Sequence, residues 1–268
     1  MVASSKLHRA QQAIENMRPY ERHLSRIMAT LVSSLGDEVS TPYGVVRDVR
    51  RVAIVVYTSN SSLCGGFNAN AIKAFTAKVK AYRDAGVEVV KVFALGRKAY
   101  DAACKAGFKD LDDYSALLDH PAYSAAASIA AEIMRLYSTE AIDRADLIYH
   151  HFKSAGAQVL TEEQFLPVEL KSDAVESDEK VDRWTLDFIV EPSKEQVVRQ
   201  LVPKSLYIKI FTALLDSLAS EHAARVVAMQ VATDNADDLL RELTLTYNKT
   251  RQYAITAELL DIVGGSMK

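Results

Sequence analysis

Hydrophobic and polar residues in the last quarter of the chain follow the pattern of one long helix. From Lys204 to Val263 there is neither glycine nor proline, and at 1.5 Å per residue a helix of that length extends about 90 Å. A compact domain of this size has a much smaller radius, so we expect the helix to project and to need a partner helix or a surrounding cavity. Its seam positions, which alternate in steps of four and three as in a coiled coil, are Phe211, Leu215, Leu218, His222, Arg225, Met229, Ala232, Ala236, Leu239 and Leu243.

The first 48 residues predict a second helix with a seam of its own. Steps of three and four connect Leu7, Ala10, Ile14, Met17, Glu21, Leu24, Met28, Leu31 and Leu35. Pro19 lies inside this helix and is expected to kink or loosen it, because proline removes one backbone donor. Gly36 is expected to end the helix. The two seams indicate that helices from opposite ends of the chain are wound together.

The middle of the chain alternates between short apolar strands and helices. We expect strands at 51–57, 87–95 and 145–152 and helices at 68–85, 97–106 and 122–140, with Asn68 as an N-cap. This alternation is typical of right-handed crossovers and a parallel sheet. Residues 157–166 follow Gly156 closely, which predicts a hairpin after the third strand.

Residues 169–202 form a different kind of segment. The acidic stretch 172–182 predicts a solvated loop, and residues 183–190 predict an edge strand. One face of that strand carries Trp184, Leu186, Phe188 and Val190. Pro192 should end the strand, and Pro203 suits the first turn of the long helix.

These patterns divide the chain into four parts. They are an N-terminal helix at 1–48, an α/β domain at 49–168, a connection of loop, edge strand and short helix at 169–202, and the long helix at 203–268. The predicted fold class is therefore α/β, with a Rossmann-like βαβ domain joined to a coiled coil made by the two terminal helices.

Composition excludes several classes of function. The net charge of −3 argues against an electrostatically driven nucleic-acid binder. No apolar run approaches the roughly 18 residues of a membrane span, and no secretory signal is present, so we expect membrane association only through partners. The two cysteines, Cys64 and Cys104, are too few for a disulfide framework and favour a reducing, cytoplasmic setting.

Catalytic motifs are also missing from the sequence. It contains no phosphate loop, no dinucleotide fingerprint, no zinc-protease motif and no nucleophile elbow. A helix N-terminus could activate Cys64 in the loop 58–66, but without an identifiable base we interpret this loop as a tight turn. An α/β enzyme with a Cys64 nucleophile stays the alternative. His150 and His151 point to opposite faces of a strand and cannot easily share an ion, so we expect neither a metal nor a cofactor.

Two groups of polar residues on the long helix are candidates for partner contacts. His222 and Arg225 occupy seam positions where a coiled coil places aliphatic residues, and such broken rules often mark function. Gln252 and Thr256 share one face at i, i+4, with Glu258 close by. They precede an apolar tip formed by Leu259, Leu260, Ile262 and Val263. The residues alone leave partner binding and plain solvent exposure equally open for this group.

The motifs along the chain resemble those of one known family, the γ subunit of rotary ATP synthases. The resemblance rests on Ser220-Glu-His-Ala-Ala-Arg225, Ala232-Thr-Asp-Asn-Ala236, Tyr247-Asn-Lys-Thr-Arg-Gln252 and Ile255-Thr-Ala-Glu258, with Met1 to Gln11 and Leu63-Cys-Gly-Gly-Phe-Asn68 in the same order. It covers essentially the whole chain.

The resemblance implies a central rotor stalk. Its antiparallel coiled coil would stand inside a ring of α and β catalytic subunits, and its foot would stand on the membrane rotor ring beside the ε subunit. Such a stalk does no bond chemistry. It biases each β subunit in turn, so that rotation is coupled to ATP synthesis or hydrolysis. The implied location is peripheral, at the cytoplasmic face of a bacterial plasma membrane.

The resemblance also implies roles for individual residues. Arg225, Gln252, Thr256 and Glu258 match family positions that engage loops of the β subunits, and the guanidinium of Arg225 suits a partner carboxylate. Glu191 matches a foot loop near the rotor ring. The apolar tip (Leu259, Leu260, Ile262 and Val263) matches the end that turns in an apolar sleeve at the top of the ring.

The sequence departs from the family pattern in two places. Asn60-Ser61-Ser62 replaces an acidic–basic–glycine triplet, which puts any family role of this loop in doubt. Family members also extend upstream of the residue that matches Met1, so either the start is misassigned, the sequence is trimmed, or the upper rod is a single helix. A third hypothesis, a coiled-coil scaffold unrelated to energy conversion, predicts that Arg225→Ala and Gln252→Ala leave ATPase activity unchanged.

Overall fold

A four-stranded mixed sheet lies at the centre of the body of the molecule. The computed structural model describes residues 2–35, 41–168, 190–191 and 193–266. The strand order is β2-β1-β3-β4. β1 (Arg51–Tyr57) pairs in parallel with β2 (Glu88–Leu95) and with β3 (Arg144–Ser154). β3 pairs antiparallel with β4 (Ala157–Leu166), so the predicted parallel sheet and its final hairpin are confirmed.

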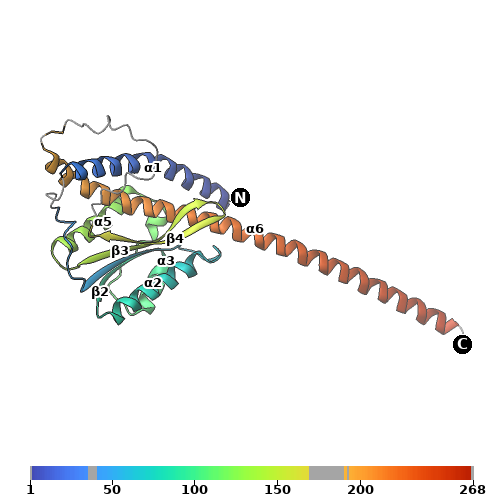
Figure 1. Ribbon diagram of the computed structural model, residues 1–268. Helices are drawn as coiled ribbons and strands as arrows, with labels where there is room; N and C mark the ends of the chain where they lie inside the picture. Colours follow the sequence, from blue (N-terminus) through green and yellow to red (C-terminus); the bar gives the residue numbers. More distant parts are fainter. Residues whose placement is uncertain (1, 36–40, 169–189, 192, 267–268) are drawn as a thin grey trace.

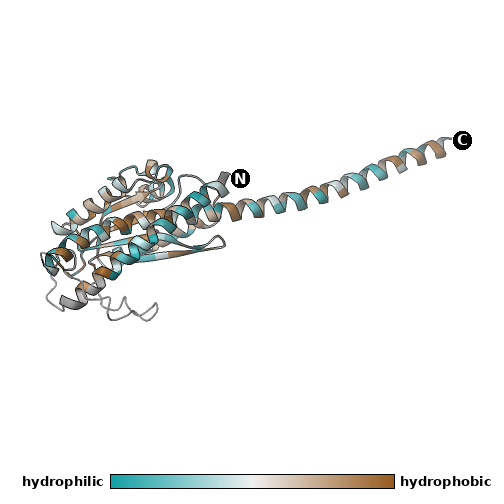
Figure 2. Cartoon of the chain, turned by 90° about the horizontal axis from the view of Figure 1, so that it is seen from above, coloured by the Kyte–Doolittle hydropathy of each residue, from teal (hydrophilic) through white to brown (hydrophobic). Residues whose placement is uncertain are grey.

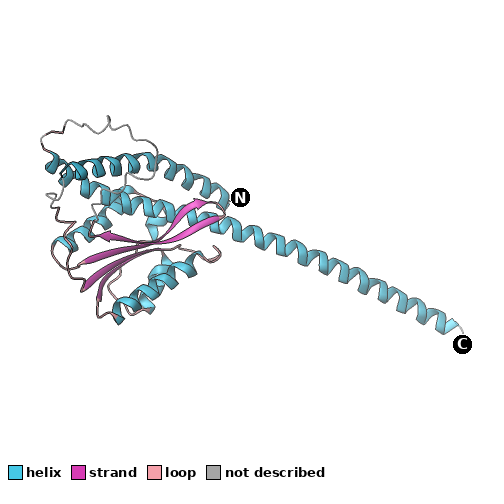
Figure 3. Ribbon diagram, in the orientation of Figure 1, coloured by secondary structure: helices cyan, strands magenta, loops and turns pink. Residues whose placement is uncertain are grey.

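Helices cover both faces of this sheet (Figures 1 and 3). α2 (Phe67–Asp84) and α3 (Arg97–Lys105) pack on the face that carries Ile54 and Val56. The opposite face carries Val55 and Tyr57 and packs against α4 (Ser115–Asp119), α5 (Tyr123–Ser138) and α6 (Lys194–Ser266). Burial on both faces explains why β1 is a continuous apolar run rather than an alternating one.

The terminal helices pack side by side in opposite directions, as predicted. The start of α1 (Val2–Leu35) contributes Leu7 and Ile14 to a cluster with Leu215, Ala219 and Ala223 of α6. The later residues Met28 and Leu31 join the main core together with Val198, Val202 and Leu206 from the start of α6. This order along the two helices makes the pair antiparallel.

Beyond this pair, α6 continues alone as a rod (Figure 1). It has 73 residues against 34 in α1, or about 110 Å against about 51 Å at 1.5 Å per residue. Every described residue from Met229 to Ser266 is exposed. Among the described residues, the contact between the two seams ends near Ala223, and the rod beyond it is a single helix, one of the alternatives that the sequence left open.

Two local predictions differ from the structure, and a third is left untested. Pro203 lies inside α6 rather than in its first turn, because the helix already begins at Lys194. The N-cap of α2 is Gly66, and Asn68 instead binds the preceding loop through its side chain. α1 continues through Pro19 as one helix, and the kink or loosening expected there stays a prediction.

Other sequence predictions lie outside the described residues. These are the helix stop at Gly36, the acidic loop 172–182, the strand face of Trp184, Leu186 and Phe188, and the strand end at Pro192. Among the helices that the structure describes, none has an apolar stretch long enough to cross a membrane.

Candidate functional site

The surface of the rod has no partner within the described part of this chain, and every described residue from Met229 to Ser266 is exposed. Hydrophobic and hydrophilic residues alternate along its length (Figure 2), and the tip residues Leu259, Leu260, Ile262 and Val263 are 58, 66, 68 and 52% exposed. A row of exposed large apolar side chains is typical of an interaction surface rather than of a solvated helix.

The predicted polar group near the tip lies on this free surface. Gln252, Thr256 and Glu258 are all exposed. The hydroxyl of Thr256 donates to the carbonyl of Gln252 at 2.8 Å, a local bond that leaves the amide of Gln252 and the carboxylate of Glu258 available to a partner. Their spacing on one helix fixes them as a rigid set, because α-helical geometry sets the distance between their side chains.

Arg225 lies elsewhere, at the root of the rod. It is 27 residues from Gln252, or about 40 Å along the helix, so the structure does not bring the two predicted contacts together. Its guanidinium is engaged within the chain: Nη1 pairs with Glu221 Oε1 at 2.6 Å, and Nη2 donates to Ser61 Oγ at 2.8 Å. Burial raises the pKa of Glu221, and Arg225 opposes that shift.

Glu191 is exposed and lies just before α6, at the end of the helix that is far from the tip. The residue predicted for a foot contact and those predicted for a tip contact therefore lie near opposite ends of one continuous helix. A continuous helix about 110 Å long has the length needed to connect two partners at its opposite ends.

α6 packs beside the place where α/β sheets commonly bind ligands, and a pocket of about 320 Å³ remains next to it, lined in part by Asn60, Ser61 and Arg225. In this class of sheet, ligands bind outside the carboxyl ends of the strands, at a switch point such as that between β1 and β3. The hydroxyl of Tyr57, the last residue of β1, donates to the carbonyl of Ile210 in α6 at 3.1 Å. Ser220 of the same helix donates to the carbonyl of His150 in β3, also at 3.1 Å.

The geometry around Cys64 does not favour nucleophilic chemistry. The side chain is 1% exposed, and its sulfur accepts a hydrogen bond from the amide of Asn68 at 3.1 Å. Ser59 Oγ lies 3.8 Å from the same sulfur. None of these neighbours is a base, and a thiol this deeply buried has no path to a substrate. Cys64 packs the loop, as the structural interpretation of the sequence expected.

His150 and His151 serve two separate structural contacts. His150 is buried and stacks on Phe67, with ring centroids 4.3 Å apart. His151 instead pairs with Asp216 of α6, with Nδ1 and Oδ2 2.7 Å apart. Among the described residues no group of three or more His, Cys, Asp or Glu side chains is placed to hold a metal ion.

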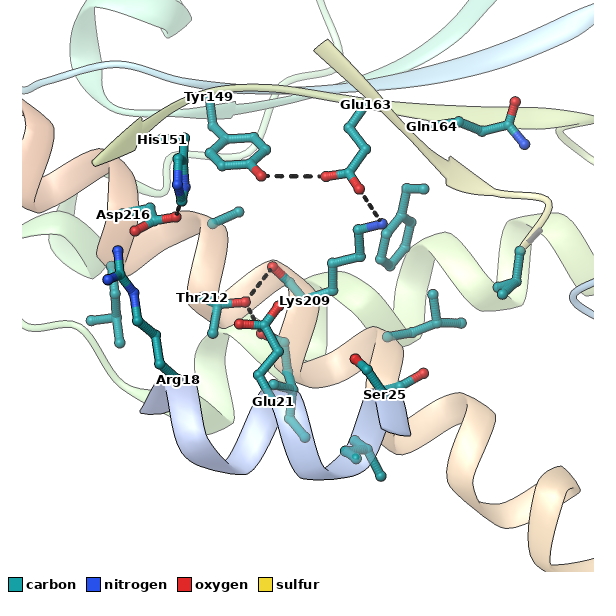
Figure 4. A pocket seen from close by; sticks show the side chains of 18 of the residues that line it. Arg18, Glu21, Ser25, Tyr149, His151, Glu163, Gln164, Lys209, Thr212 and Asp216 are labelled. Atoms are coloured by element: carbon teal, nitrogen blue, oxygen red, sulfur yellow. Dashed lines mark hydrogen bonds and ion pairs between the residues drawn. The ribbon is translucent and has the colours of Figure 1, made fainter. Parts of the chain in front are cut away.

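A charged cleft of about 710 Å³ is lined by α1, α6 and the strands β3 and β4 (Figure 4). Its walls are joined in pairs: Lys209 to Glu163 at 2.7 Å, and Asp216 to His151. Glu21 of α1 points into the same space (Figure 4), and burial, followed by the charge of Asp216, raises its pKa. The cleft holds charged side chains from four elements, α1, β3, β4 and α6, and its two ion pairs join α6 to the sheet.

Comparison with known sequences identifies the family. A family model described as ATP synthase matches residues 1–267. The ATP synthase gamma chains of Phocaeicola vulgatus and Bacteroides fragilis are each 52% identical over 267 residues, which is 100% of this chain and 91% of theirs. The chain belongs to the ATP synthase gamma-chain family. The resemblance found in the sequence motifs is therefore confirmed.

Two solved structures share the fold. One chain in the central stalk and c-ring structure of the Tetrahymena thermophila mitochondrial ATP synthase aligns with a TM-score of 0.60 at 23% identity, covering 87% of this chain and 96% of that one. One from the Euglena gracilis mitochondrial ATP synthase aligns with a TM-score of 0.52 at 21% identity, covering 98% and 94%. These alignments confirm the predicted fold class of an α/β body with a long C-terminal helix.

Sequence reasoning missed the residues that hold the root of the rod. Glu221, Ser61 and Ser220 were not singled out as contacts. Ser61 and Ser220 bind across the junction between α6 and the body, and Glu221 pairs with Arg225 within α6. The available signal was Arg225 itself, a charged residue in an apolar seam. It marked the position but not the intrachain partners.

Proposed function

We propose that the chain is the central rotor stalk of an ion-translocating ATP synthase. It couples rotation of a membrane rotor ring to conformational change in the catalytic β subunits, and it is itself a non-catalytic subunit. The observation that carries this proposal is the single helix α6, which is anchored in the body at one end and fully exposed from Met229 to Ser266 at the other. Membership of the gamma-chain family gives that shape its role.

The physical basis of such coupling is differential contact. A rotor position that binds one β conformation more tightly than another shifts that subunit's equilibrium, and it shifts nothing if it binds both equally. Each tenfold change in nucleotide affinity requires about 1.4 kcal/mol of difference. A hydrogen bond to a charged group contributes about 1.5–3 kcal/mol, so a few polar contacts on the rod suffice.

We assign these contacts to the two groups on the rod and to its ends. Gln252, Thr256 and Glu258 face loops of the β subunits, and Arg225 contributes from the root with the guanidinium donors that its internal bonds leave free. The tip (Leu259, Leu260, Ile262 and Val263) turns within an apolar sleeve of the α and β ring. Glu191 lies at the foot, near the rotor ring and the ε subunit.

The division of the chain follows from this assignment. Residues 1–48 and 203–268 form the shaft, 49–168 the foot domain, and 169–202 the connection at the rotor-ring end. The complex sits at the cytoplasmic face of a bacterial plasma membrane, with this subunit peripheral and attached through its partners.

The test is co-expression of this chain with the α and β subunits of Bacteroides fragilis, purification through a tag on β, and ATPase assay. We expect one copy of the chain in an active ring, and bound beads that rotate when ATP is added. Gln252→Ala should lower the hydrolysis rate about tenfold, the loss of one charge-assisted contact. Asp237→Ala, an exposed change on the same rod, is the matched control and should leave the rate unchanged. Absence of the chain from the purified ring, or equal rates for both variants, would contradict the proposal.

A further inference from the structure

The root of the rod contains a contact that the stalk role alone does not explain. We define the neck as the loop Ser59–Gly66 together with Ser220–Ala228 of α6. At the neck, Arg225 Nη2 donates to the hydroxyl of Ser61 at 2.8 Å and to the carbonyl of Ser62 at 3.4 Å. Nη1 pairs with Glu221 at 2.6 Å, and the side chains of Arg225 and Glu221 are only 18% and 7% exposed. One guanidinium thus connects the rod to a loop of the body.

The loop end of this contact is firmly held. Asn68 accepts from the backbone of Ser59 at 2.9 Å and donates to the carbonyl of Ser61 at 3.2 Å. Asn60 donates to the carbonyl of Ser115 at 2.9 Å and accepts from the backbone of Arg97 at 3.2 Å. The loop is therefore tied to α2, α3 and α4 and follows directly from β1, so it moves with the sheet.

The neck is also where the packing of α6 against the body ends. Ala223 is fully buried, whereas Val227 is 45% exposed, and every described residue from Met229 onward is exposed. Ser220, one turn before Arg225, still donates to the carbonyl of His150. Any twisting force between the rod and the body must cross these few residues.

Geometry makes this contact sensitive to twist. A helix with its side chains has a radius of about 6 Å, so a rotation of 10° about its axis displaces surface groups by about 1 Å. A displacement of that size would lengthen a 2.8 Å hydrogen bond beyond bonding distance. The apolar contacts below the neck tolerate such sliding better, because dispersion contacts have no comparable directional requirement.

We propose that Ser61 and Arg225 form a bracket that fixes the angle of the rod about its axis relative to the α/β body, with Ser61 as a positioning residue for rotor coupling. The bracket uses the same Arg225 that the proposed function assigns to a β-subunit contact, and it rests on that proposed stalk function. An arginine has five N–H donors in a rigid fork, so the bracket and a β-subunit contact are compatible. Asn60-Ser61-Ser62 replaces the triplet that the sequence resemblance led us to expect, and the bracket gives this departure a use.

The experiment compares three substitutions in the loop. Ser61→Ala removes the acceptor hydroxyl, Ser61→Thr keeps it, and Ser62→Ala is the matched control because Ser62 contributes only its backbone carbonyl. Both serines are exposed, so none of the changes threatens the core. Cys104 on α3 is exposed and Cys64 is buried, so a maleimide attaches a bead to the body without mutation.

In the assembled complex, with the α and β ring fixed and paused on nucleotide, the angular variance of the bead reports neck stiffness. We expect at least a twofold larger variance for Ser61→Ala and wild-type variance for Ser61→Thr and Ser62→Ala. Membrane-reconstituted complexes should show fewer ions pumped per ATP for Ser61→Ala alone. Equal variance and equal coupling for all four proteins, with wild-type rotating, would overturn the bracket while leaving the stalk function intact.

A second measurement uses the isolated full chain and does not depend on assembly. Hydrogen exchange of the loop amides 61–66 should be at least threefold faster in Ser61→Ala than in wild type, with Ser61→Thr and Ser62→Ala close to wild type. Equal exchange in all four proteins would also overturn the bracket. If the four proteins show the expected exchange pattern but the wild-type chain never joins a rotating ring, the stalk function is contradicted instead.

Discussion

Acid should destabilise the body of this protein through one buried histidine. His150 is 3% exposed, stacks on Phe67, and has a buried Nδ1 without a hydrogen-bond partner. Burial lowers its pKa from 6.5 to about 4, because the charged imidazolium is poorly solvated there. The folded chain therefore keeps His150 neutral at pH values where the unfolded chain protonates it.

The sign and size of the pH effect on the free energy of unfolding follow from this pKa difference. Below pH 6.5 the unfolded state binds more protons than the folded state, so the free energy of unfolding falls as pH falls, until about pH 4. Between pH 7 and pH 5 the loss from this single group is about 2 kcal/mol. At a urea m-value of about 2 kcal/mol/M this equals a midpoint shift of about 1 M.

The assay is urea unfolding followed by near-ultraviolet circular dichroism at pH 7, 6 and 5. Tyr57 and Tyr137 are fully buried in the body, so this signal reports the body rather than the rod. His150→Phe keeps an aromatic ring on Phe67 and cannot titrate. We expect the difference in unfolding free energy between wild type and His150→Phe to change by about 2 kcal/mol across this range, in favour of the variant in acid.

The comparison between the two proteins removes the other titrating groups. Burial raises the pKa of Glu21, Asp216 and Glu221, so these carboxyls add stability as pH falls and oppose the histidine. His222 has a pKa lowered to about 4 by burial, Arg225 and Lys6 and acts in the same direction as His150. All of these are present in both proteins. A difference that stays constant within about 0.5 kcal/mol from pH 7 to pH 5 would refute the assignment to His150.

Three further predictions concern the stability of the body and use the same urea assay at pH 7. Leu214→Ala, at a fully buried position of α6, should lower the free energy of unfolding by about 2–5 kcal/mol. Leu245→Ala on the rod, where the side chain is 72% exposed, should change it by less than about 0.5 kcal/mol. Similar losses for the two variants would contradict the separation of rod and core. Gly96→Ala should lower the free energy of unfolding by more than about 2 kcal/mol, because φ is +106° and an added Cβ would lie 2.7 Å from the backbone oxygen of Thr58. Gly86→Ala, at φ +71° with open space around it, should lower it by about 1 kcal/mol. A larger loss for Gly86→Ala would refute the close approach of Gly96 to Thr58. Asp146→Asn should lower the free energy of unfolding by about 3–5 kcal/mol, because it removes the buried carboxylate that pairs with both Lys78 and Arg144. A near-neutral result would show that these two ion pairs do not stabilise the body.

Elements with strong local signals were predictable from the sequence. β1 was found because its β-branched run is buried on both faces, and the rod because no glycine or proline interrupts it. The end of α2 was also found, since the predicted helix 68–85 stops before Gly86, which has φ +71° and donates its backbone N–H to the carbonyl of Arg83. In each case the pattern and the structure depend on the same few neighbouring residues.

Contacts between distant residues were not predictable in this way. Arg225 and Ser61 are 164 residues apart, so no periodicity connects them, and the seam pattern indicated a partner helix at the position that the loop occupies. Asn68 is of a residue type common at N-caps, but its side chain binds Ser59 and Cys64. Asparagine forms caps and loop contacts with the same side-chain groups, and only the fold selects between them.

The rod and the body draw their stability from different sources. The body buries its own core, but α6 beyond Met229 has no buried residue, and most helical stability in proteins comes from packing an apolar face. Leu239, Leu240 and Leu243 are each more than half exposed, so the contacts that order this part of the helix must come from other chains. A stalk whose upper half is ordered by the subunits it acts on transmits force only while it contacts them. The neck, by contrast, is held by bonds within the chain. The angle between body and rod can therefore be set by this chain alone, whereas the stiffness of the rod depends on its surroundings.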